Sequence, residues 1–161
     1  MQEIVLIPNE RVGVLIGKNG KTKEMLEREA SARIKVEEQE VIIDCDSPET
    51  LIRAVDVVKA IGRGFSPEHA FLLLQDDFEL AVITLQGENH NTVKRLMARV
   101  IGKKGATKRI IEEETNCLLS VYGKTVALIG KQPGLSRAET SVEEILRGKS
   151  HAYVYAKLKK D

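Results

Sequence analysis

The feature that most constrains this chain is an internal repeat. Residues 16–36 and 101–121 align without a gap at a constant offset of 85, and nine of the twenty-one aligned positions are identical. The identical pairs are Ile16/Ile101, Gly17/Gly102, Lys18/Lys103, Gly20/Gly105, Thr22/Thr107, Lys23/Lys108, Glu27/Glu112, Glu29/Glu114 and Val36/Val121. A chain of 161 residues has room for two small domains, so we predict two copies of one unit.

Both copies show the same order of strand and helix patterns. Apolar runs such as EVIIDC in the first copy and KTVALIG in the second predict strands. Apolar residues at helical spacing follow each glycine-containing loop, and Ser47-Pro48-Glu49 is typical of a helix start. Because each element has one apolar side to bury, we predict an α+β fold. Each unit is expected to be a three-stranded antiparallel sheet with three helices packed on one face.

The predicted units cover residues 1–64 and 79–150, with a joining segment at 65–78 and a tail at 151–161. The joining segment is apolar from Ala70 to Leu74 and has a helix start at Ser66, which is not typical of a flexible tether. We expect it to form a short helix that packs between the units and holds them in a fixed relation. The tail is too short to assign from its sequence.

The first glycine loop, IGKNGKTK, resembles half of a nucleotide-binding phosphate loop. The full pattern, G-x-x-x-x-G-K-[ST], requires a glycine at position 15, where the chain has Leu15. The same test at Gly123-Lys124-Thr125 finds Leu118 in place of the first glycine. Neither stretch is therefore predicted to bind a nucleoside triphosphate.

An I-G-x-x-G loop between two helices, in this element order, resembles a KH domain of type I. The resemblance implies that each loop holds the backbone of about four nucleotides of single-stranded RNA or DNA. Glycines let the sugar-phosphate chain approach closely, and the helix that starts at the loop directs free N–H groups and the positive end of its dipole toward phosphates. We expect the bases to lie beside aliphatic side chains such as Ile16, Ile34, Ile101 and Leu119, positions that also fit core packing.

The candidate RNA-binding residues lie in the two loops and on the elements beside them. They are Gly17, Lys18, Asn19, Gly20, Lys21, Arg33, Lys94, Arg95, Arg99, Gly102, Lys103, Lys104, Gly105, Lys108 and Arg109. Lys21 and Lys108 also fit solvated helix charges. Arg33 aligns with Leu118, so a base contact and a plain surface charge are both open for it. In the helix before the second loop, Val93, Leu96, Val100 and Ile101 are expected to face inward, which leaves Lys94, Arg95 and Arg99 free to face RNA.

The charge is unevenly divided along the chain. Residues 1–65 carry ten Lys/Arg and twelve Asp/Glu, residues 66–78 add three acidic residues, and residues 79–161 carry fifteen Lys/Arg and nine Asp/Glu. Positive charge attracts a polyanion and makes its binding depend on salt. We therefore expect the second unit to be the main RNA anchor.

Three further segments make the resemblance more specific. GFSPEHAFLLLQDDFEL, GKKGATKRIIEEETN and SHAYVYAKL are similar to the archaeal branch of the partner-of-Nob (Dim) family, and the similarity covers essentially the whole chain. It implies binding near the 3′ end of small-subunit ribosomal RNA, alongside a Nob-type endonuclease and small-subunit assembly or initiation factors. Eukaryotic members tend to have a degraded first loop, whereas Gly17-Lys18-Asn19-Gly20 is intact here.

Other classes of function find little support. The chain has no Ser/His/Asp or Cys/His set, and its cysteines and histidines lack zinc-ligand spacing, so we predict no catalysis, no metal and no cofactor. No apolar run approaches the roughly 18–20 residues of a membrane span, and we expect a cytoplasmic protein without a membrane partner. Two alternatives remain open: an RNA-binding adaptor in translation or RNA processing, and a scaffold that binds a nuclease or initiation factor through the acidic first unit.

Overall fold

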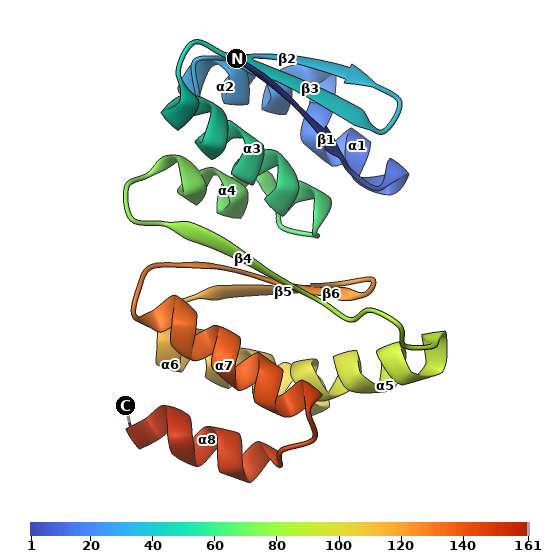
Figure 1. The fold of residues 1–161 in the computed structure, drawn as a ribbon, viewed down its shortest axis with the longest axis vertical. Helices are drawn as coiled ribbons and strands as arrows, with labels where there is room; N and C mark the ends of the chain where they lie inside the picture. Colours follow the sequence, from blue (N-terminus) through green and yellow to red (C-terminus); the bar gives the residue numbers. More distant parts are fainter. Residues whose placement is uncertain (161) are drawn as a thin grey trace. The chain divides into compact units, whose positions relative to one another are not determined.

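The computed structural model describes residues 1–160, which form parts of two compact units, Met1–Phe78 and Glu79–Asp161. The first unit contains β1 Gln2–Leu6, α1 Asn9–Ile16, the 3-10 turn η1 Lys18–Gly20, α2 Lys21–Glu29, β2 Ala32–Glu37, β3 Glu40–Cys45, α3 Pro48–Gly62, α4 Pro67–Ala70 and η2 Phe71–Leu74. The second contains β4 Glu79–Thr84, α5 His90–Ile101, η3 Lys103–Gly105, α6 Ala106–Thr115, β5 Leu118–Tyr122, β6 Thr125–Gly130, α7 Gly134–Leu146 and α8 His151–Lys160 (Figure 1).

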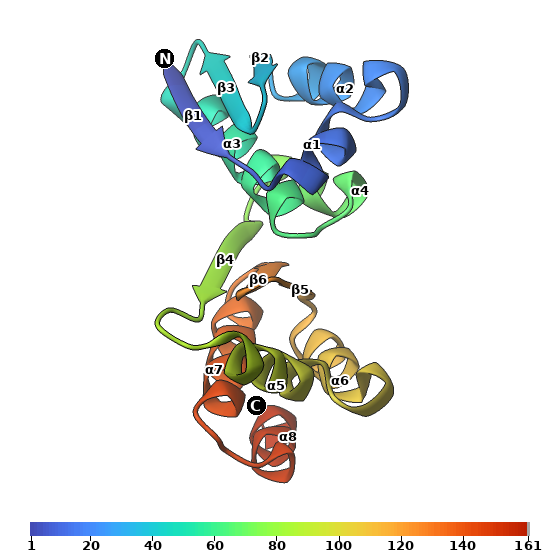
Figure 2. The same ribbon diagram turned by 90° about the vertical axis from the view of Figure 1, so that its right-hand side faces the viewer.

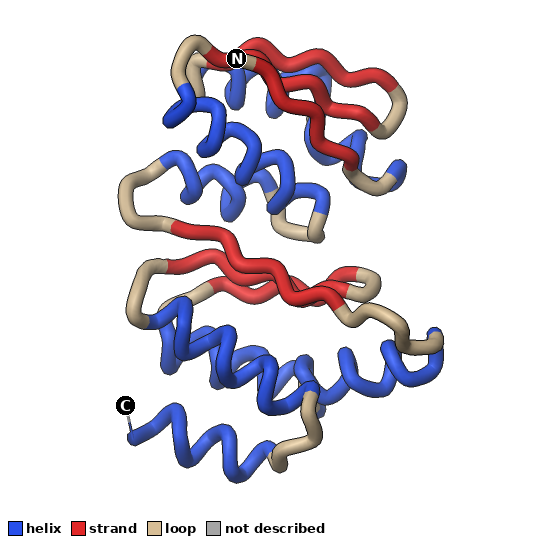
Figure 3. The backbone as a smooth tube through the Cα atoms, in the orientation of Figure 1, coloured by secondary structure: helices blue, strands red, loops and turns tan. Residues whose placement is uncertain are grey.

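Each unit is built on one three-stranded antiparallel sheet. The strand orders are β1-β3-β2 and β4-β6-β5, so the last strand of each unit lies in the centre. Within each unit the helices cover one face of the sheet (Figures 1, 2 and 3). The predicted fold, two α+β units of the same type, is confirmed.

The pattern of burial in the strands shows why one face of the first sheet is covered. In β2, Ala32 and Ile34 are buried while Arg33 and Lys35 are exposed. Successive strand residues point to opposite faces, so the apolar residues pack under the helices and the charged ones lie on the outer face. In the second unit, the core is formed by apolar residues of the sheet and of all four helices, among them Val100, Ile111, Leu128, Val142 and Val154.

The segment 65–78 packs within the first unit. Ser66 caps α4 by accepting a hydrogen bond from the His69 N–H, and Ala70 and Leu73 are buried. Both α4 and η2 contact α3, and the Arg53 guanidinium donates to the Leu74 carbonyl over 2.7 Å. The helix start at Ser66 is therefore real, whereas the fixed relation between the units remains a prediction.

The tail that could not be assigned from sequence is helical. It forms α8, which packs against α6 and α7 with Val154 and Leu158 buried. These two residues are four apart, so they lie on the same side of the helix.

Candidate nucleic-acid interface

The first glycine of each loop is required by packing as well as by backbone conformation. Gly17 has φ 77° and ψ 174°, and Gly102 has φ 78° and ψ 171°. A Cβ atom at Gly17 would overlap the side chain of Thr22, and one at Gly102 would overlap Thr107. Because side-chain-bearing residues rarely adopt this conformation, both glycines are needed, and the repeat of Thr22 as Thr107 is explained.

The rest of each loop is left-handed and open. Asn19 and Lys104 have φ near 55°, and the closing glycines, Gly20 and Gly105, also have positive φ. A Cβ added at Gly20 or Gly105 would meet no atom within 4 Å. The loops therefore face outward and leave room for another backbone to approach.

The helices that follow the loops have free amino-terminal ends. The residue that precedes each helix is Gly20 for α2 and Gly105 for α6, and neither helix has a side-chain cap. The first N–H of each helix, that of Lys21 or Ala106, bonds to the carbonyl of Lys18 or Lys103 in the turn. The next N–H groups have no side-chain cap, so they can bind a phosphate. Lys18 and Lys103 are exposed beside these amides, and so is Lys104 in the second loop.

An apolar groove lies next to the second loop. It has a volume of about 560 Å³ and runs along α5 to the turn between β5 and β6. Its lining residues are His90, Val93, Lys94, Met97, Ala98, Ile101, Gly123 and Lys124. Ile101, which directly precedes the loop, is 37% exposed. Aliphatic side chains in the groove and lysines beside them suit bases and backbone phosphates, respectively.

Sequence reasoning identified only part of this groove. Lys94 and Ile101 were among the expected contacts, whereas Met97 was not. Gly123 and Lys124 were considered only as a failed nucleotide loop. The position of Gly123 and Lys124 could have indicated their role, because the tight turn between the last two strands of a KH-like unit lies opposite the first helix.

Arg99 does not have the free side chain that we predicted. Its guanidinium donates to the carbonyl of Ile145 over 2.6 Å and to that of Lys149 over 2.7 Å, at the carboxyl end of α7. In the first unit, Arg11 donates to the carbonyls of Ile61 and Phe65, each over 2.8 Å. Carbonyl groups at a helix end attract cationic donors, so both arginines stabilise the fold.

The remaining cations that were predicted to bind RNA differ in their exposure and contacts. Arg109 donates to the Lys104 carbonyl over 3.1 Å and so supports the loop. Arg95 is exposed on α5 but is not part of the groove lining, and Lys108 is half-buried on α6. Lys21, in the first unit, is exposed at the start of α2. The RNA contacts of these four residues stay predictions.

Arg33 lies on the outer face of the first sheet. Its guanidinium lies 3.1 Å from Asp46 and 3.2 Å from Asp44. Hydrogen bonds to Asp46 and Asp44 raise the pKa of Arg33, and the bond from Arg33 lowers the pKa of Asp44. The Arg33 side chain is thus paired with two carboxylates, and its base contact remains an untested prediction.

Ile34 and Leu119 belong to the core, which is the first of the two roles that the sequence allowed for them. Both are buried. Their backbone N–H groups donate to carboxylates of the preceding helix, Ile34 to Glu27 over 3.0 Å and Leu119 to Glu112 over 2.9 Å. These bonds satisfy N–H groups of edge strands and explain why this glutamate is repeated.

Two features of the described residues concern other classes of function. Within residues 1–160, no group of three or more His, Cys, Asp or Glu side chains lies close enough to hold a metal ion. No helix in the same range is both long enough and apolar enough to cross a membrane.

Comparison with known proteins agrees with the geometry of the loops. Residues 2–60 match the KH domain family, and residues 77–161 match a family described as the eukaryotic type KH-domain (KH-domain type I). The molecule is therefore a tandem KH-domain protein.

Three relatives narrow this class. A KH domain-containing protein of Methanocaldococcus jannaschii is 40% identical, over 99% of this chain and 73% of the relative. Crystalline Dim2p from Pyrococcus horikoshii OT3 is 41% identical with a TM-score of 0.94, covering 100% of this chain and 99% of that one. A chain in the a/eIF2alpha–aDim2p–rRNA complex from the same organism is 41% identical with a TM-score of 0.92, covering 99% and 93%. The chain belongs to the archaeal Dim2p family.

Proposed function

We propose that the protein is a non-catalytic single-stranded RNA-binding factor of small-subunit ribosome biogenesis that binds near the 3′ end of the small-subunit rRNA. The similarity to a chain from a complex that contains rRNA supports the choice of RNA. KH-domain proteins are generally not enzymes. We assign any cleavage of the rRNA to a partner such as a Nob-type endonuclease, and we place the protein in the cytoplasm.

The observation that carries the proposal is the combination of loop, helix end and groove in the second unit. The loop Gly102–Gly105 is open on its outer side, α6 begins without a side-chain cap, and the groove begins at Ile101. The loop can hold phosphates while the neighbouring bases lie along α5.

The direct test reverses two charges in the second loop. Lys103→Asp/Lys104→Asp removes two charge-assisted contacts to phosphate and adds repulsion, so affinity should fall by about a hundredfold or more. Fluorescence anisotropy with a labelled single-stranded RNA of the archaeal small-subunit rRNA 3′ end measures this loss.

The matched control is Lys159→Asp/Lys160→Asp. It makes the same change in charge at exposed positions at the end of α8, outside the loop and the groove. Its affinity should stay within about threefold of the wild type, since only long-range attraction changes. Equal losses in both variants would mean that net charge, not the loop, determines binding.

A second candidate function, binding of a protein partner, is favoured by the outer sheet face of the first unit. Ile4 is 53% exposed and Leu6 is 70% exposed on β1, an edge strand. The strand β3 brings Glu40 opposite Leu6. An exposed apolar edge strand is a common site of protein association. The similar Pyrococcus complex contains a/eIF2alpha beside aDim2p, which makes an initiation factor the first partner to test.

Ile4→Ser/Leu6→Ser tests this second candidate. We expect it to abolish co-elution with a/eIF2alpha while RNA affinity is unchanged. Ile52→Ser, which alters an exposed apolar residue of α3 in the same unit, serves as the control and should retain the partner.

A further inference from the structure

The carboxyl-terminal helix α8 reaches the RNA-binding loop of its own unit through one hydrogen bond. The hydroxyl groups of Tyr155 on α8 and Thr107 on α6 lie 2.7 Å apart, at the distance expected for an O–H to O hydrogen bond. Thr107 is the second residue of α6, directly after the loop. A helix distant from the loop in sequence therefore contacts the residue against which the loop packs.

Thr107 is held tightly between the loop and α8. Its side chain is only 1% exposed. On one side it occupies the space that a Cβ of Gly102 would need, with the Thr107 Cβ atom 2.7 Å from that position. On the other side it bonds to Tyr155. A rotation of the threonine side chain would therefore disturb the first glycine of the loop.

The helix α8 is itself anchored at both ends. At its start, His151 Nε2 lies 2.9 Å from the Arg99 carbonyl near the end of α5, and the His151 ring stacks on the Tyr155 ring with centroids 6.0 Å apart. At its end, Arg137 of α7 donates to the Leu158 carbonyl over 2.7 Å, and Lys157 pairs with Glu144. Two anchored ends limit the movement of Tyr155 relative to Thr107.

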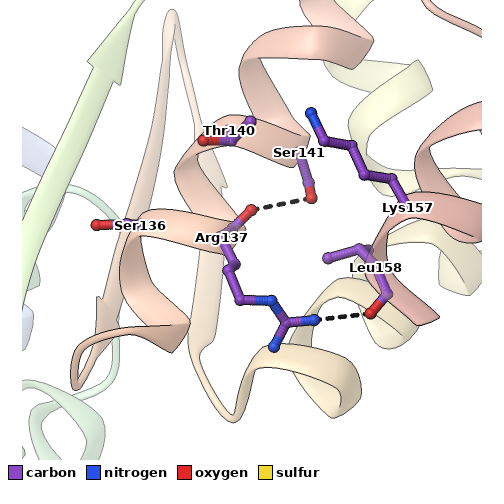
Figure 4. A pocket seen from close by; sticks show the side chains of 6 residues that line it. All are labelled: Ser136, Arg137, Thr140, Ser141, Lys157 and Leu158. Atoms are coloured by element: carbon purple, nitrogen blue, oxygen red, sulfur yellow. Dashed lines mark hydrogen bonds between the residues drawn. The ribbon is translucent and has the colours of Figure 1, made fainter. Parts of the chain in front are cut away.

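Figure 4 shows the second of these anchors. Arg137 and Ser141 extend from α7 toward Lys157 and Leu158 of α8, around a small pocket of about 220 Å³. The Ser141 hydroxyl donates to the Arg137 carbonyl over 2.9 Å, while the Arg137 guanidinium reaches the Leu158 carbonyl. The Arg137 side chain thus joins α7 to α8 beside this pocket, and we assign it a structural role.

The first unit contains Thr22 at the position equivalent to Thr107 but cannot make the same bond. All three tyrosines of the chain, Tyr122, Tyr153 and Tyr155, lie in the second unit. Thr22 is also more exposed than Thr107. The same loop conformation therefore occurs with the tyrosine support in one unit and without it in the other.

We infer that α8 is a positioning element for RNA binding, in which Tyr155 holds Thr107 and thereby keeps the Gly102–Gly105 loop in its binding conformation. The inference rests on the proposed function, because it assigns the support to the loop that binds RNA. Tyr155 acts through Thr107 and is a positioning residue. A preformed loop loses less conformational freedom when RNA binds, and this is the source of the expected gain in affinity.

The test removes the hydroxyl groups without removing the side chains. Tyr155→Phe keeps the ring, and Thr107→Val keeps the branched shape that packs on Gly102. Each variant should bind the labelled single-stranded rRNA 3′-end probe about threefold to tenfold more weakly, the effect of one hydrogen bond. The double variant should be no weaker than the weaker single variant, because both changes remove the same bond.

Two readouts separate positioning from general destabilisation or direct contact. The N–H groups of Gly105 and Ala106 bond to the carbonyls of Gly102 and Lys103 in the loop. Their amide exchange in the free protein should be faster in both variants, at a temperature where circular dichroism shows the chain fully folded. The slope of log affinity against log salt should match the wild type, because no phosphate contact is lost. Tyr153→Phe, at an exposed tyrosine of the same helix, is the matched control and should change neither readout.

The outcomes distinguish this inference from the function on which it rests. Wild-type protein that fails to bind the RNA probe would overturn the proposed function. If the wild type binds the probe and the affinities of Tyr155→Phe and Thr107→Val lie within twofold of the wild-type affinity, only the role of α8 would be overturned. Additive losses in the double variant would also overturn it, since the two hydroxyl groups would then act separately.

Discussion

The two units share a loop but differ in what surrounds it. The backbone angles of Gly17 and Gly102 agree within 3°, and those of Asn19 and Lys104 agree within 1°. Residues 1–78 nevertheless carry ten Lys/Arg and fifteen Asp/Glu, a net charge of −5, while residues 79–161 carry fifteen and nine, a net charge of +6. Loop shape is thus a local property, whereas attraction of RNA depends on the whole unit.

The internal supports of the two units also differ. Arg11 and Arg99 both donate to carbonyls at the end of the third helix of their unit, but Arg11 aligns with Leu96 in the repeat, one helical turn before Arg99. An arginine thus bonds to the end of the third helix in both units, but from two different positions on the same face of the first helix. The fold requires this contact and not a particular position for the arginine.

The largest expected difference between the units is in RNA affinity. Lys18→Asp/Lys21→Asp makes the same change of charge at the first loop as Lys103→Asp/Lys104→Asp makes at the second. We expect a loss below about tenfold for the first pair and of about a hundredfold or more for the second. The salt slope should become about 1.4 less steep only for the second pair, since each lysine–phosphate contact on a single strand contributes about 0.7. Anisotropy titrations at several salt concentrations measure both quantities, and equal losses would contradict a dominant second unit.

The next effect concerns stability, where the units should behave alike. Gly17→Ala and Gly102→Ala should each destabilise their unit by about 3 kcal/mol, because a Cβ is strained at positive φ and overlaps the following threonine. Native-state amide exchange in α2 and α6 reports the local free energy of unfolding. Gly13→Ala is the control: its Cβ meets nothing within 4 Å in α1, and the helix should gain about 0.5–1 kcal/mol. If only one of the two glycine variants lost stability, the two loops would differ in how they relax around an added side chain.

A smaller effect tests the arginine contacts. Arg11→Met and Arg99→Met each remove two charge-assisted hydrogen bonds to carbonyls but keep an apolar stem, and we expect each to cost about 2 kcal/mol of unfolding free energy. Amide exchange in α3 and α7 provides the measurement. Arg95→Met changes an exposed arginine of α5 and should stay within about 0.5 kcal/mol of the wild type. If Arg99→Met left the free energy of unfolding unchanged, the prediction that this side chain is free to bind RNA would be supported again.

The smallest expected effect depends on pH. Burial raises the pKa of Asp56 on α3. When α3 and α7 are aligned so that Ile61 matches Ile145, the residue of α7 that matches Asp56 is Thr140, which carries no charge. The folded state disfavours ionised Asp56, so this penalty is complete at neutral pH and disappears below the ordinary pKa of 3.8. Asp56→Asn should therefore stabilise the first unit at pH 7 and have no effect near pH 3, as measured by amide exchange in α3. A stabilisation that persists at the lower pH would be inconsistent with removal of a buried charge.

The glycine loops were predictable because their signal is local. Gly17 and Gly102 recur at a fixed offset, and the left-handed conformations that they adopt are open to few other residues. The helix starts at Ser47 and Ser66 are likewise short-range patterns, and both were predicted correctly. The family resemblance and the charge difference between the units also came from the sequence.

The errors concerned contacts between elements that are far apart in the chain. Arg99 has the spacing of a surface residue on α5, and only the carbonyls of Ile145 and Lys149, 46 and 50 residues away, show its role. Ile34 and Leu119 fit either a core or a base contact until the helices are placed on the sheet. Lys124 became part of a groove only when its turn was brought opposite α5.

The amino-acid sequence alone determined the duplication, the two glycine turns, the element order and the unequal charge of the units, because these depend on neighbouring residues and on composition. The tertiary structure decided which cations remain free, where the apolar groove lies, and that Tyr155 reaches Thr107 across 48 residues. Those properties depend on the directions of side chains from separate helices and strands, and such directions exist only after the helices have packed on the sheet.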